Sequence, residues 1–384
     1  MKLLWVNPSF LDYRISVYEY LNKLSNGNFY LVYSKERVPD RCIDKVEQIL
    51  GDNALGLEKE QSFHIGGKGD FANTGISIPY PKGLYKLMSS VKPDVIIGEG
   101  YFQWTPWAVF RAKKLKVPFV LAYERTAHTE RNLPWWRKKY RKIVDRFVDG
   151  YIVNGTETKL YLESTGVDPQ KITIGVMSAD SFSLSQAAYN TTSEEKRELK
   201  NQLNLRHGII YLYVGRLIEL KGVKYLLEAW EKHIKTYSED NLLIVGDGPL
   251  YPKYVQEYSA ASNIHFIGAV DYDSIHKYYA IADVFVIPTL EDNWSLVVPE
   301  AMACGLPIAT SIYNGCYPDL VFDGKNGKLF DPLKENAIVS VLAYFHLIDT
   351  TEMGNLSIEI ESNYNPEKAA KRIWQASLDA INKS

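Results

Sequence analysis

Short apolar runs alternate with longer helical segments along most of the chain. Residues 3–6, 117–123 and 284–287 are examples of runs made almost entirely of Leu, Val, Ile, Ala and aromatic residues. Runs of this length and composition are typical of buried parallel strands, and amphipathic segments follow them. The repeated alternation of strand and helix predicts an α/β protein built on parallel sheets.

The same pattern indicates two domains. A chain of 384 residues is longer than one ordinary hydrophobic core requires. One strand and helix series occupies residues 1–178, and a second occupies residues 196–365. Residues 179–195 are rich in Ser, Ala, Asn and Thr, a composition typical of an interdomain linker. We therefore expect two domains joined by a linker.

Composition excludes several classes of protein. A formal net charge of −2 gives no reason to expect a nucleic-acid partner. No uninterrupted apolar stretch of about 18 residues is present to span a bilayer, and three scattered cysteines do not form a disulfide framework. The first strand follows the initial Met directly, without the pattern of a signal peptide. We expect a cytoplasmic protein.

A basic turn follows the predicted strand at residues 208–214. The turn reads Gly215-Arg-Leu-Ile-Glu-Leu-Lys-Gly222 and precedes a helical segment. Arg216 and Lys221 would therefore lie beside a helix N-terminus at the carboxyl end of a strand. Two cations and free backbone N–H groups suit a diphosphate.

An acidic segment follows the strand at residues 284–287. Pro299 is tolerated only in the first turn of a helix, so we expect a helix from about Ser295 to Gly305. Glu291 and Asp292 precede this helix, and Glu300 lies about one turn inside it. Carboxylates accept hydrogen bonds from ribose or sugar hydroxyls, while the helix N-terminus attracts phosphate. Together these features indicate a nucleotide-sugar site.

The two motifs resemble those of family 4 of the retaining glycosyltransferases. The basic turn matches a V-G-R-x4-K-G pattern, and the acidic segment, followed by Ala-Met-Ala-Cys-Gly-Leu-Pro, resembles E-x7-E but departs from it at the first acid. Asp292 has the eight-residue spacing to Glu300, while Glu291 lies one residue further out, so either can take the first acidic role. The resemblance implies a GT-B fold, in which two Rossmann-like domains face a central cleft and a C-terminal helix, here 366–384, returns to the N-terminal domain.

The resemblance also implies roles for individual residues. Arg216 and Lys221 would neutralise the departing diphosphate, Glu300 would hold ribose, and His128 would orient the transferred sugar. The bound base, uridine or guanosine, would be contacted by backbone, and we expect a UDP-sugar. No cofactor and no metal are required if two cations and a helix end supply the positive charge. The expected donor-binding residues are Gly215, Arg216, Lys221, Gly246, Gly268, Glu291, Asp292, Asn293, Ser295, Leu296, Val297, Val298 and Glu300.

The first half of the chain supplies candidates for binding the acceptor. The turn after the first strand, Asn7-Pro-Ser-Phe-Leu-Asp-Tyr-Arg14, lacks the glycines of a dinucleotide fingerprint and argues against an NAD-dependent oxidoreductase. Arg14 suits an acidic or phosphate-bearing acceptor, or else is a surface arginine beside a helix that we expect at residues 17–24. Glu99, Tyr101 and Glu124 follow later strands and complete the expected acceptor set.

Residues 131–146 combine positive charge with aromatic side chains. Such a helix suits an anionic membrane surface, and the alternative is a solvated helix whose tryptophans pack inward. The residues concerned are Arg131, Arg137, Lys138, Lys139, Arg141, Lys142 and Arg146, with Trp135, Trp136 and Tyr140.

Three functions remain compatible with these motifs. The first is a retaining glycosyltransferase that acts on a glycan or lipid-linked acceptor in surface polysaccharide synthesis. The second is an epimerase or hydrolase of the same fold that acts on a nucleotide-sugar. The third is a binding protein that has the donor site without catalysis.

Overall fold

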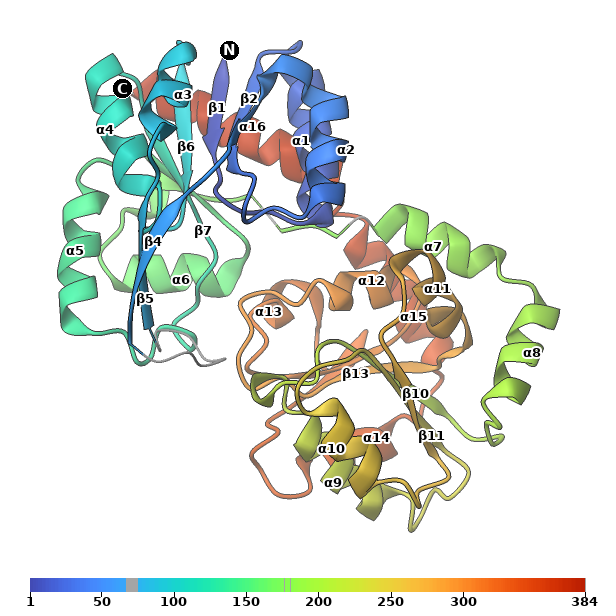
Figure 1. The fold of residues 1–384 in the computed structure, drawn as a ribbon. Helices are drawn as coiled ribbons and strands as arrows, with labels where there is room; N and C mark the ends of the chain where they lie inside the picture. The colour runs from blue at the N-terminus through green and yellow to red at the C-terminus, as the bar shows by residue number, and fades with distance from the viewer. Residues whose placement is uncertain (67–74, 176, 180, 384) are drawn as a thin grey trace. The chain divides into compact units, whose positions relative to one another are not determined.

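The computed structural model describes residues 1–66, 75–175, 177–179 and 181–383, which divide into two compact units. The first unit comprises Met1–Ser178 together with Pro366–Ser384, and the second comprises Ala179–Asn365. Each unit contains a parallel sheet with helices packed on it (Figure 1). This is the α/β class that the alternating sequence pattern predicts.

The sheet of the first unit has seven strands among the described residues, in the order β3-β2-β1-β6-β7-β8-β9. Leu3 of the central strand β1 pairs in parallel with Phe29 on one side and Val95 on the other. The chain order reverses between β1 and β6, which makes this the topological switch point. The strands are β1 (Leu3–Val6), β2 (Phe29–Ser34), β3 (Ala54–Leu57), β6 (Val95–Glu99), β7 (Phe119–Tyr123), β8 (Gly150–Val153) and β9 (Ile172–Ile174), with a separate antiparallel pair of β4 (Gln61–Gly66) and β5 (Gly75–Tyr80).

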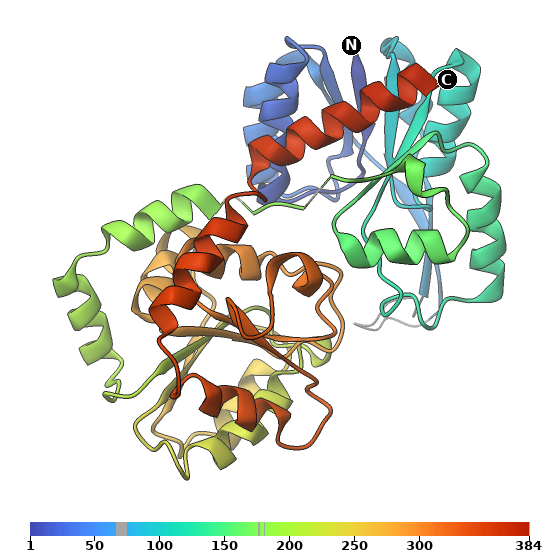
Figure 2. The ribbon, with the colours of Figure 1, turned by 180° about the vertical axis from the view of Figure 1, so that it is seen from behind.

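The C-terminal helix α16 belongs to the first unit. It packs on α1, β8 and β9 through a stripe of small residues that includes Ala369, Ala376 and Ala380, and Figure 2 shows it in red across the sheet. Small side chains allow this close approach. The helices of the unit are α1 (Asp12–Leu24), α2 (Asp40–Leu50), α3 (Leu84–Ser90), α4 (Thr105–Leu115), α5 (Trp135–Asp145), α6 (Thr156–Ser164) and α16 (Pro366–Lys383), with 3-10 turns η1 (Gly51–Asn53) and η2 (Pro169–Lys171).

The second unit repeats this arrangement with six strands among the described residues, in the order β12-β11-β10-β13-β14-β15. Its switch point lies between β10 and β13, where Leu212 pairs with Phe285. The strands are β10 (Ile210–Val214), β11 (Asn241–Val245), β12 (Ile264–Gly268), β13 (Val284–Ile287), β14 (Ile308–Ser311) and β15 (Gly327–Phe330). The helices are α7 (Ser181–Asn190), α8 (Ser193–Gln202), α9 (Val223–His233), α10 (Tyr251–Glu257), α11 (Tyr272–Ile281), α12 (Val297–Ala303), α13 (Tyr317–Leu320), α14 (Ala337–Tyr344) and α15 (Thr350–Glu361), with the 3-10 turn η3 (Glu219–Lys221).

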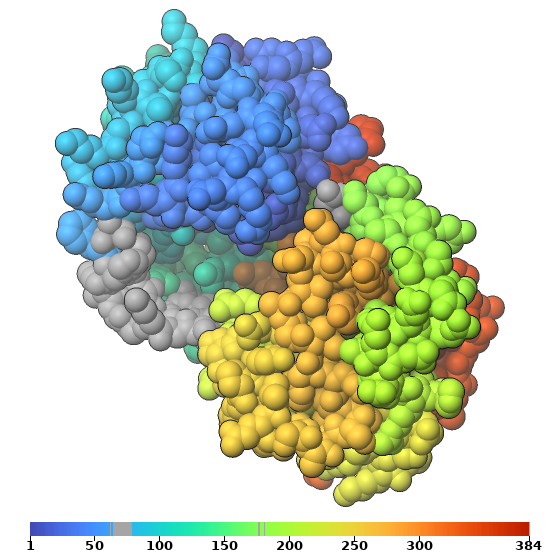
Figure 3. All heavy atoms as spheres, turned by 45° about the vertical axis from the view of Figure 1, so that its right-hand side comes forward, coloured from blue at the N-terminus to red at the C-terminus, as the bar shows by residue number. Residues whose placement is uncertain are grey.

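The linker predicted at residues 179–195 is wrong, because most of this segment is helical. Leu184 and Ala188 of α7 are buried, and α7 packs against α11 and α12 (Figure 3). Helix α8 begins with a capping box in which Thr192 and Glu195 bond reciprocally. Ser, Asn and Thr suggest a linker by composition, but the same residue types cap helices.

The first helix begins earlier than predicted. Helix α1 starts at Asp12 rather than near residue 17, which places Arg14 in its first turn. The Asp12 carboxylate suits this position because it faces the positive end of the helix dipole, and it also pairs with Arg41 and Lys45 of α2. Within the described part of the chain, no helix combines the length and the apolar character needed to cross a bilayer.

Candidate active site

The loops after β10 and β13 are bonded to each other at the switch point of the second unit. The backbone N–H of Leu290 donates to the Leu220 carbonyl at 2.7 Å, and the Thr289 hydroxyl donates to the same oxygen at 3.0 Å. Ligands of open α/β sheets bind at this edge, outside the carboxyl ends of the strands. The two predicted motifs therefore meet where a ligand is expected.

Glycines allow these loops to approach closely. Gly222 has a φ of +67°, and a Cβ atom there would lie 2.1 Å from the Pro288 carbonyl oxygen. Gly246 has a φ of +133°, and its Cβ would lie 2.0 Å from the Gly215 carbonyl oxygen. The backbone N–H of Gly246 also donates to the Gly268 carbonyl at 2.8 Å. The ends of β10, β11 and β12 are thus bonded side by side.

Lys221 and Asp292 form an ion pair across the two loops. The Lys221 ammonium contacts Asp292 Oδ2, the Ser295 hydroxyl donates to the same oxygen, and the backbone N–H of Trp294 donates to Oδ1 at 3.1 Å. The Lys221 and Asp292 side chains are 21% and 15% exposed. Arg216, in the same turn as Lys221, is exposed to solvent.

Asp292 is the acid whose carboxylate meets the lysine. Its backbone is bonded to the loop after β14, since the Gly315 N–H donates to the Asp292 carbonyl at 3.0 Å. Asn314 in that loop accepts from the Ser295 N–H at 3.4 Å, a role that no sequence pattern had indicated. The neighbouring Glu291 is buried. The structure therefore places the Asp292 carboxylate beside the basic turn.

Glu300 lies inside α12, a helix that begins at Val297 and is shorter than predicted. Burial raises the pKa of Glu300 to about 7, and a hydrogen bond of 3.1 Å donated by the Tyr279 hydroxyl opposes part of this rise. Tyr279 comes from α11 and was not among the predicted residues, because only the packing of α11 and α12 against α7 brings it near Glu300. Leu296, Val297 and Val298 form the start of α12, after Asn293 and Ser295.

Three of the predicted acceptor residues meet at the switch point of the first unit. The Arg14 guanidinium lies 3.3 Å from Glu99 Oε1 and 2.8 Å from Glu124 Oε1, and the Trp5 indole N–H donates to Glu99 Oε2 at 3.0 Å. Arg14 is buried, so it is not the surface arginine of the alternative interpretation. Burial raises the pKa of Glu99, the Arg14 charge lowers it, and the Glu124 charge raises it.

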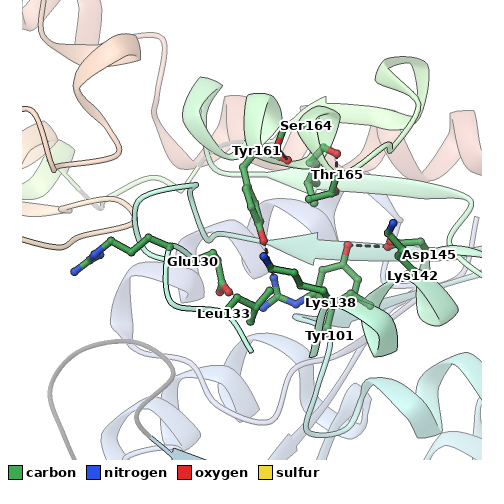
Figure 4. A pocket seen from close by; sticks show the side chains of 12 residues that line it. Tyr101, Glu130, Leu133, Lys138, Lys142, Asp145, Tyr161, Ser164 and Thr165 are labelled. Atoms are coloured by element: carbon green, nitrogen blue, oxygen red, sulfur yellow. Dashed lines mark hydrogen bonds and ion pairs between the residues drawn. The ribbon is translucent and has the colours of Figure 1, made fainter. Parts of the chain in front are cut away.

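Tyr101 and His128 lie elsewhere in the first unit. The Tyr101 ring is buried, and its hydroxyl donates to Asp145 Oδ1 at 2.7 Å under α5. Tyr101 is thus not brought together with Arg14, because its side chain points into a pocket of about 420 Å³ between α5 and α6 (Figure 4). His128 is partly buried in the loop after β7, and its carbonyl accepts from the Arg131 guanidinium at 2.5 Å.

Helix α5 presents tryptophan to solvent and arginine to the core. Trp135 is 69% exposed and Ile143 is 54% exposed, beside the exposed Lys139. Arg137 and Arg141 are buried, and Arg141 pairs with Glu130 at 3.0 Å. The alternative in which both tryptophans pack inward is therefore wrong, and hydrogen bonds to Glu130, Tyr123 and Tyr161 hold Arg141 inward instead.

Comparisons with known proteins bear on both units. Residues 53–174 match the family model described as Glycosyltransferase Family 4, and residues 208–345 match that described as Glycosyl transferases group 1. The chain belongs to the family 4 glycosyltransferases. The second match contains both the Lys221 turn and the Glu300 helix.

Curated relatives of this family 4 chain include a synthase of a glucosylated diacylglycerol and a sulfoquinovosyl transferase. Alpha-monoglucosyldiacylglycerol synthase of Acholeplasma laidlawii is 32% identical over 201 residues, which cover 50% of this chain and 49% of that protein. Sulfoquinovosyl transferase SQD2 of Arabidopsis thaliana is 26% identical over 314 residues, which cover 78% of this chain and 59% of that protein. The chain thus matches about half to three fifths of the length of these relatives.

Solved structures share the fold over nearly the whole chain. HepE of Anabaena in complex with UDP has a TM-score of 0.75 and 16% identity, covering 98% of this chain and 99% of that one. A glycosyltransferase from Rickettsia africae has a TM-score of 0.75 and 16% identity, covering 100% and 99%. These likenesses establish that the family 4 chain has the GT-B class of fold.

Proposed function

We propose that this protein is a retaining glycosyltransferase that moves a sugar from a nucleoside-diphosphate-sugar, with UDP-sugar as the donor, to a glycan or lipid-linked acceptor. The observation that carries the proposal is the meeting of Lys221 with Asp292 at the switch point of the second unit. The family supports this reading. The Anabaena structures, which are titled as complexes with UDP and UDP-glucose, support the choice of donor.

In the proposed reaction, the bond between the sugar C1 and the diphosphate oxygen breaks while C1 bonds to an acceptor hydroxyl oxygen. The electron pair leaves with the diphosphate, and the acceptor hydroxyl loses its proton to an oxygen of the departing diphosphate. Arg216 and Lys221 stabilise the negative charge that grows on the leaving group, where preorganised cations are most effective. The ammonium of Lys221 has three N–H donors, so it can contact phosphate while it remains near Asp292.

The carboxylates bind hydroxyl groups of the donor in this proposal. Asp292 already accepts from the Ser295 hydroxyl, and a sugar hydroxyl is chemically the same kind of donor. Glu300 binds the ribose hydroxyls, together with the Tyr279 hydroxyl that bonds to it. His128 would orient the transferred sugar, as the family resemblance implies.

The acceptor proposal rests on the cluster of Arg14, Glu99 and Glu124. Two carboxylates surround one buried guanidinium, so the group as a whole carries no excess positive charge when both are ionised. Such a cluster suits acceptor hydroxyl groups, because carboxylate oxygens accept their hydrogen bonds. A lipid-linked or glycolipid acceptor is further supported by the name of the Acholeplasma laidlawii relative, a monoglucosyldiacylglycerol synthase.

A membrane surface is the proposed partner of α5. Exposed Trp135, Ile143 and Phe147 lie among the exposed Lys138, Lys139 and Lys142. Apolar side chains enter the headgroup region of a bilayer while lysines contact anionic lipid. We therefore propose a peripheral protein on the cytoplasmic face of a membrane, with a role in surface polysaccharide or glycolipid synthesis.

A ligand screen followed by product analysis tests the function. The protein is melted with UDP, GDP, ADP and their common sugars, with and without magnesium, and then incubated with UDP-sugar and lipid acceptors. We expect UDP to raise the melting temperature, Arg216→Ala to abolish that rise, and a new glycoside to form only when acceptor is present.

The competing functions predict other results. An epimerase or hydrolase would alter the UDP-sugar without acceptor, and a binding protein would be stabilised by UDP without any turnover. Exposed Lys224 of α9 provides the matched control, because Lys224→Ala removes a nearby cation that lies outside the motif.

A further inference from the structure

Two histidines and an aspartate meet at the amino ends of strands of the second sheet. The candidate active site lies at the opposite, carboxyl ends. His233 ends α9, Asp240 directly precedes β11, and His346 follows α14. The Nε2 atoms of His233 and His346 lie 2.8 Å and 2.7 Å from Asp240 Oδ2. Three side chains from separate segments therefore converge on one point.

The cluster is buried, and the Asp240 carboxylate oxygen Oδ2 faces the two imidazoles. The side chains of His233, Asp240 and His346 are 0%, 2% and 22% exposed. Among the described residues, the ion-pair partners of Asp240 are these two imidazoles. A buried carboxylate is costly without a positive partner, and a metal ion would supply that charge.

We propose that His233, Asp240 and His346 bind one divalent transition-metal ion, of which zinc is the best match. Two imidazoles and one carboxylate are a common zinc ligand set, with bonds of about 2.0–2.2 Å. The three ligand atoms all lie within 4.8 Å of one another, so shifts of less than roughly 1 Å would accommodate an ion. Water would complete the coordination at the partly exposed side of His346.

Neighbouring groups already orient the ligands. The backbone N–H of Ile209 donates to Asp240 Oδ1 at 2.9 Å, which leaves Oδ2 directed at the two histidines. The Tyr237 ring stacks on His346 with centroids 3.8 Å apart and on His233 with centroids 4.9 Å apart. Such outer contacts restrict ligand rotation and commonly strengthen metal sites.

The position of the cluster indicates a structural role. Helix α9 has 11 residues, about 16 Å at 1.5 Å per residue, and separates His233 from the Lys221 turn. The cluster lies at the amino ends of β10 and β11, where it would link α9 and the segment after α14 to the sheet. The ion would thus stabilise the second unit without taking part in sugar transfer.

Metal titration of the chelator-treated full chain tests the proposal. We expect Zn²⁺ to bind at one ion per chain and to raise the melting temperature to a plateau. We also expect Co²⁺ to give the intense visible bands of a four- or five-coordinate ion. These measurements need no variant and do not depend on transferase activity.

The His346→Gln variant separates a metal site from a hydrogen-bonded cluster. Glutamine can still donate an N–H to Asp240, but it is a poor zinc ligand, so we expect Zn²⁺ affinity to fall at least about tenfold and the thermal shift to disappear. His276→Gln is the control, because His276 is a partly exposed residue of α11, which packs on α7 and α8, and it should behave as the native chain. Absence of saturable Zn²⁺ and Co²⁺ binding, or unchanged binding in His346→Gln, would overturn the proposal.

Discussion

Charged residues in the candidate site have partners that the spacing of the sequence motifs does not predict. Lys221 is largely buried and paired with Asp292, and Glu300 is buried against Tyr279. The sequence motifs predicted which charged residues would be present. The partners that tune them, Ser295, Tyr279 and backbone N–H groups, follow from packing of separate loops and helices.

Replacing Lys221 with alanine should reduce catalysis and also cost some stability. We expect kcat/KM to fall at least about 100-fold, because a charge that stabilises the leaving group is lost. The free energy of unfolding should fall by roughly 1–3 kcal/mol, since Asp292 would keep fewer partners in a part-buried site. Turnover and urea denaturation measure the two effects, with Lys224→Ala as the control, and unchanged turnover would refute the assigned role.

Glu300 should make stability fall as the pH rises. Its pKa is raised from 4.5 to about 7 by burial, so the folded protein holds this proton more tightly than the unfolded chain. The associated stabilisation is therefore present below pH 4.5 and is lost as the pH rises to about 7, by roughly 3 kcal/mol for a shift of this size. Urea denaturation at pH 5, 6, 7 and 8 measures the free energy of unfolding, which should fall less with rising pH in Glu300→Gln than in the native chain. Identical pH dependence in both would contradict the shift.

At the scale of elements, turns that need glycine and the packing of helix faces determine which side chains are exposed and which are buried. The turn through Gly222 brings Lys221 against the loop after β13, while α5 turns Trp135 outward and Arg141 inward. A sequence pattern predicts that such a turn or helix exists. The neighbours of each element determine which side chains remain exposed.

Gly222→Ala should disturb the turn through steric contact. Both Gly222 and Gly166 have positive φ, but a Cβ at Gly222 would lie 2.1 Å from a backbone oxygen, whereas one at Gly166 would meet nothing within 4 Å. We expect a loss of unfolding free energy of at least about 2 kcal/mol for Gly222→Ala and about 1 kcal/mol for Gly166→Ala. Denaturant unfolding compares the two, and equal losses would rule out the steric explanation.

The double variant Trp135→Ala and Ile143→Ala should weaken binding to anionic vesicles. Burial of a large apolar side chain is worth about 1.5–3 kcal/mol, so we expect at least about tenfold weaker partitioning into vesicles that contain phosphatidylglycerol. Sedimentation with vesicles measures this, and added salt should weaken the binding of the native chain. Phe182→Ala is the matched control, because Phe182 is 68% exposed on α7. Equal binding by all variants would exclude α5 as the contact surface.

At the scale of the whole molecule, the donor candidates and the acceptor candidates belong to different units. Donor candidates such as Lys221 and Glu300 lie in the second unit, whereas Arg14 and Glu99 lie in the first. The chain returns to the first unit only through α16. The cluster of His233, Asp240 and His346 also lies in the second unit, but at the amino ends of the strands, whereas the donor candidates lie at the carboxyl ends. Metal binding and sugar transfer can therefore be measured separately.

Chelation should lower thermal stability without stopping sugar transfer. Arg216 and Lys221 provide the positive charge in the proposed reaction, so product formation with EDTA should stay within about twofold of that with magnesium at a temperature well below unfolding. The melting temperature should fall once zinc is removed from the His233 cluster. Loss of transfer in EDTA that magnesium restores would mean that the donor diphosphate needs a metal ion.

The sequence by itself determined the fold class, because strand and helix periods and the glycine stops are local properties. It also determined the V-G-R-x4-K-G motif and the spacing from Asp292 to Glu300, because each lies within one short stretch of the chain. Tertiary structure alone decided that α7 and α8 occupy most of the predicted linker and that the Asp292 carboxylate contacts Lys221. It also brought Tyr279 to Glu300 and His346 to Asp240. These pairs are separated by between 21 and 106 positions, and no local period or spacing encodes which distant side chains burial will bring together.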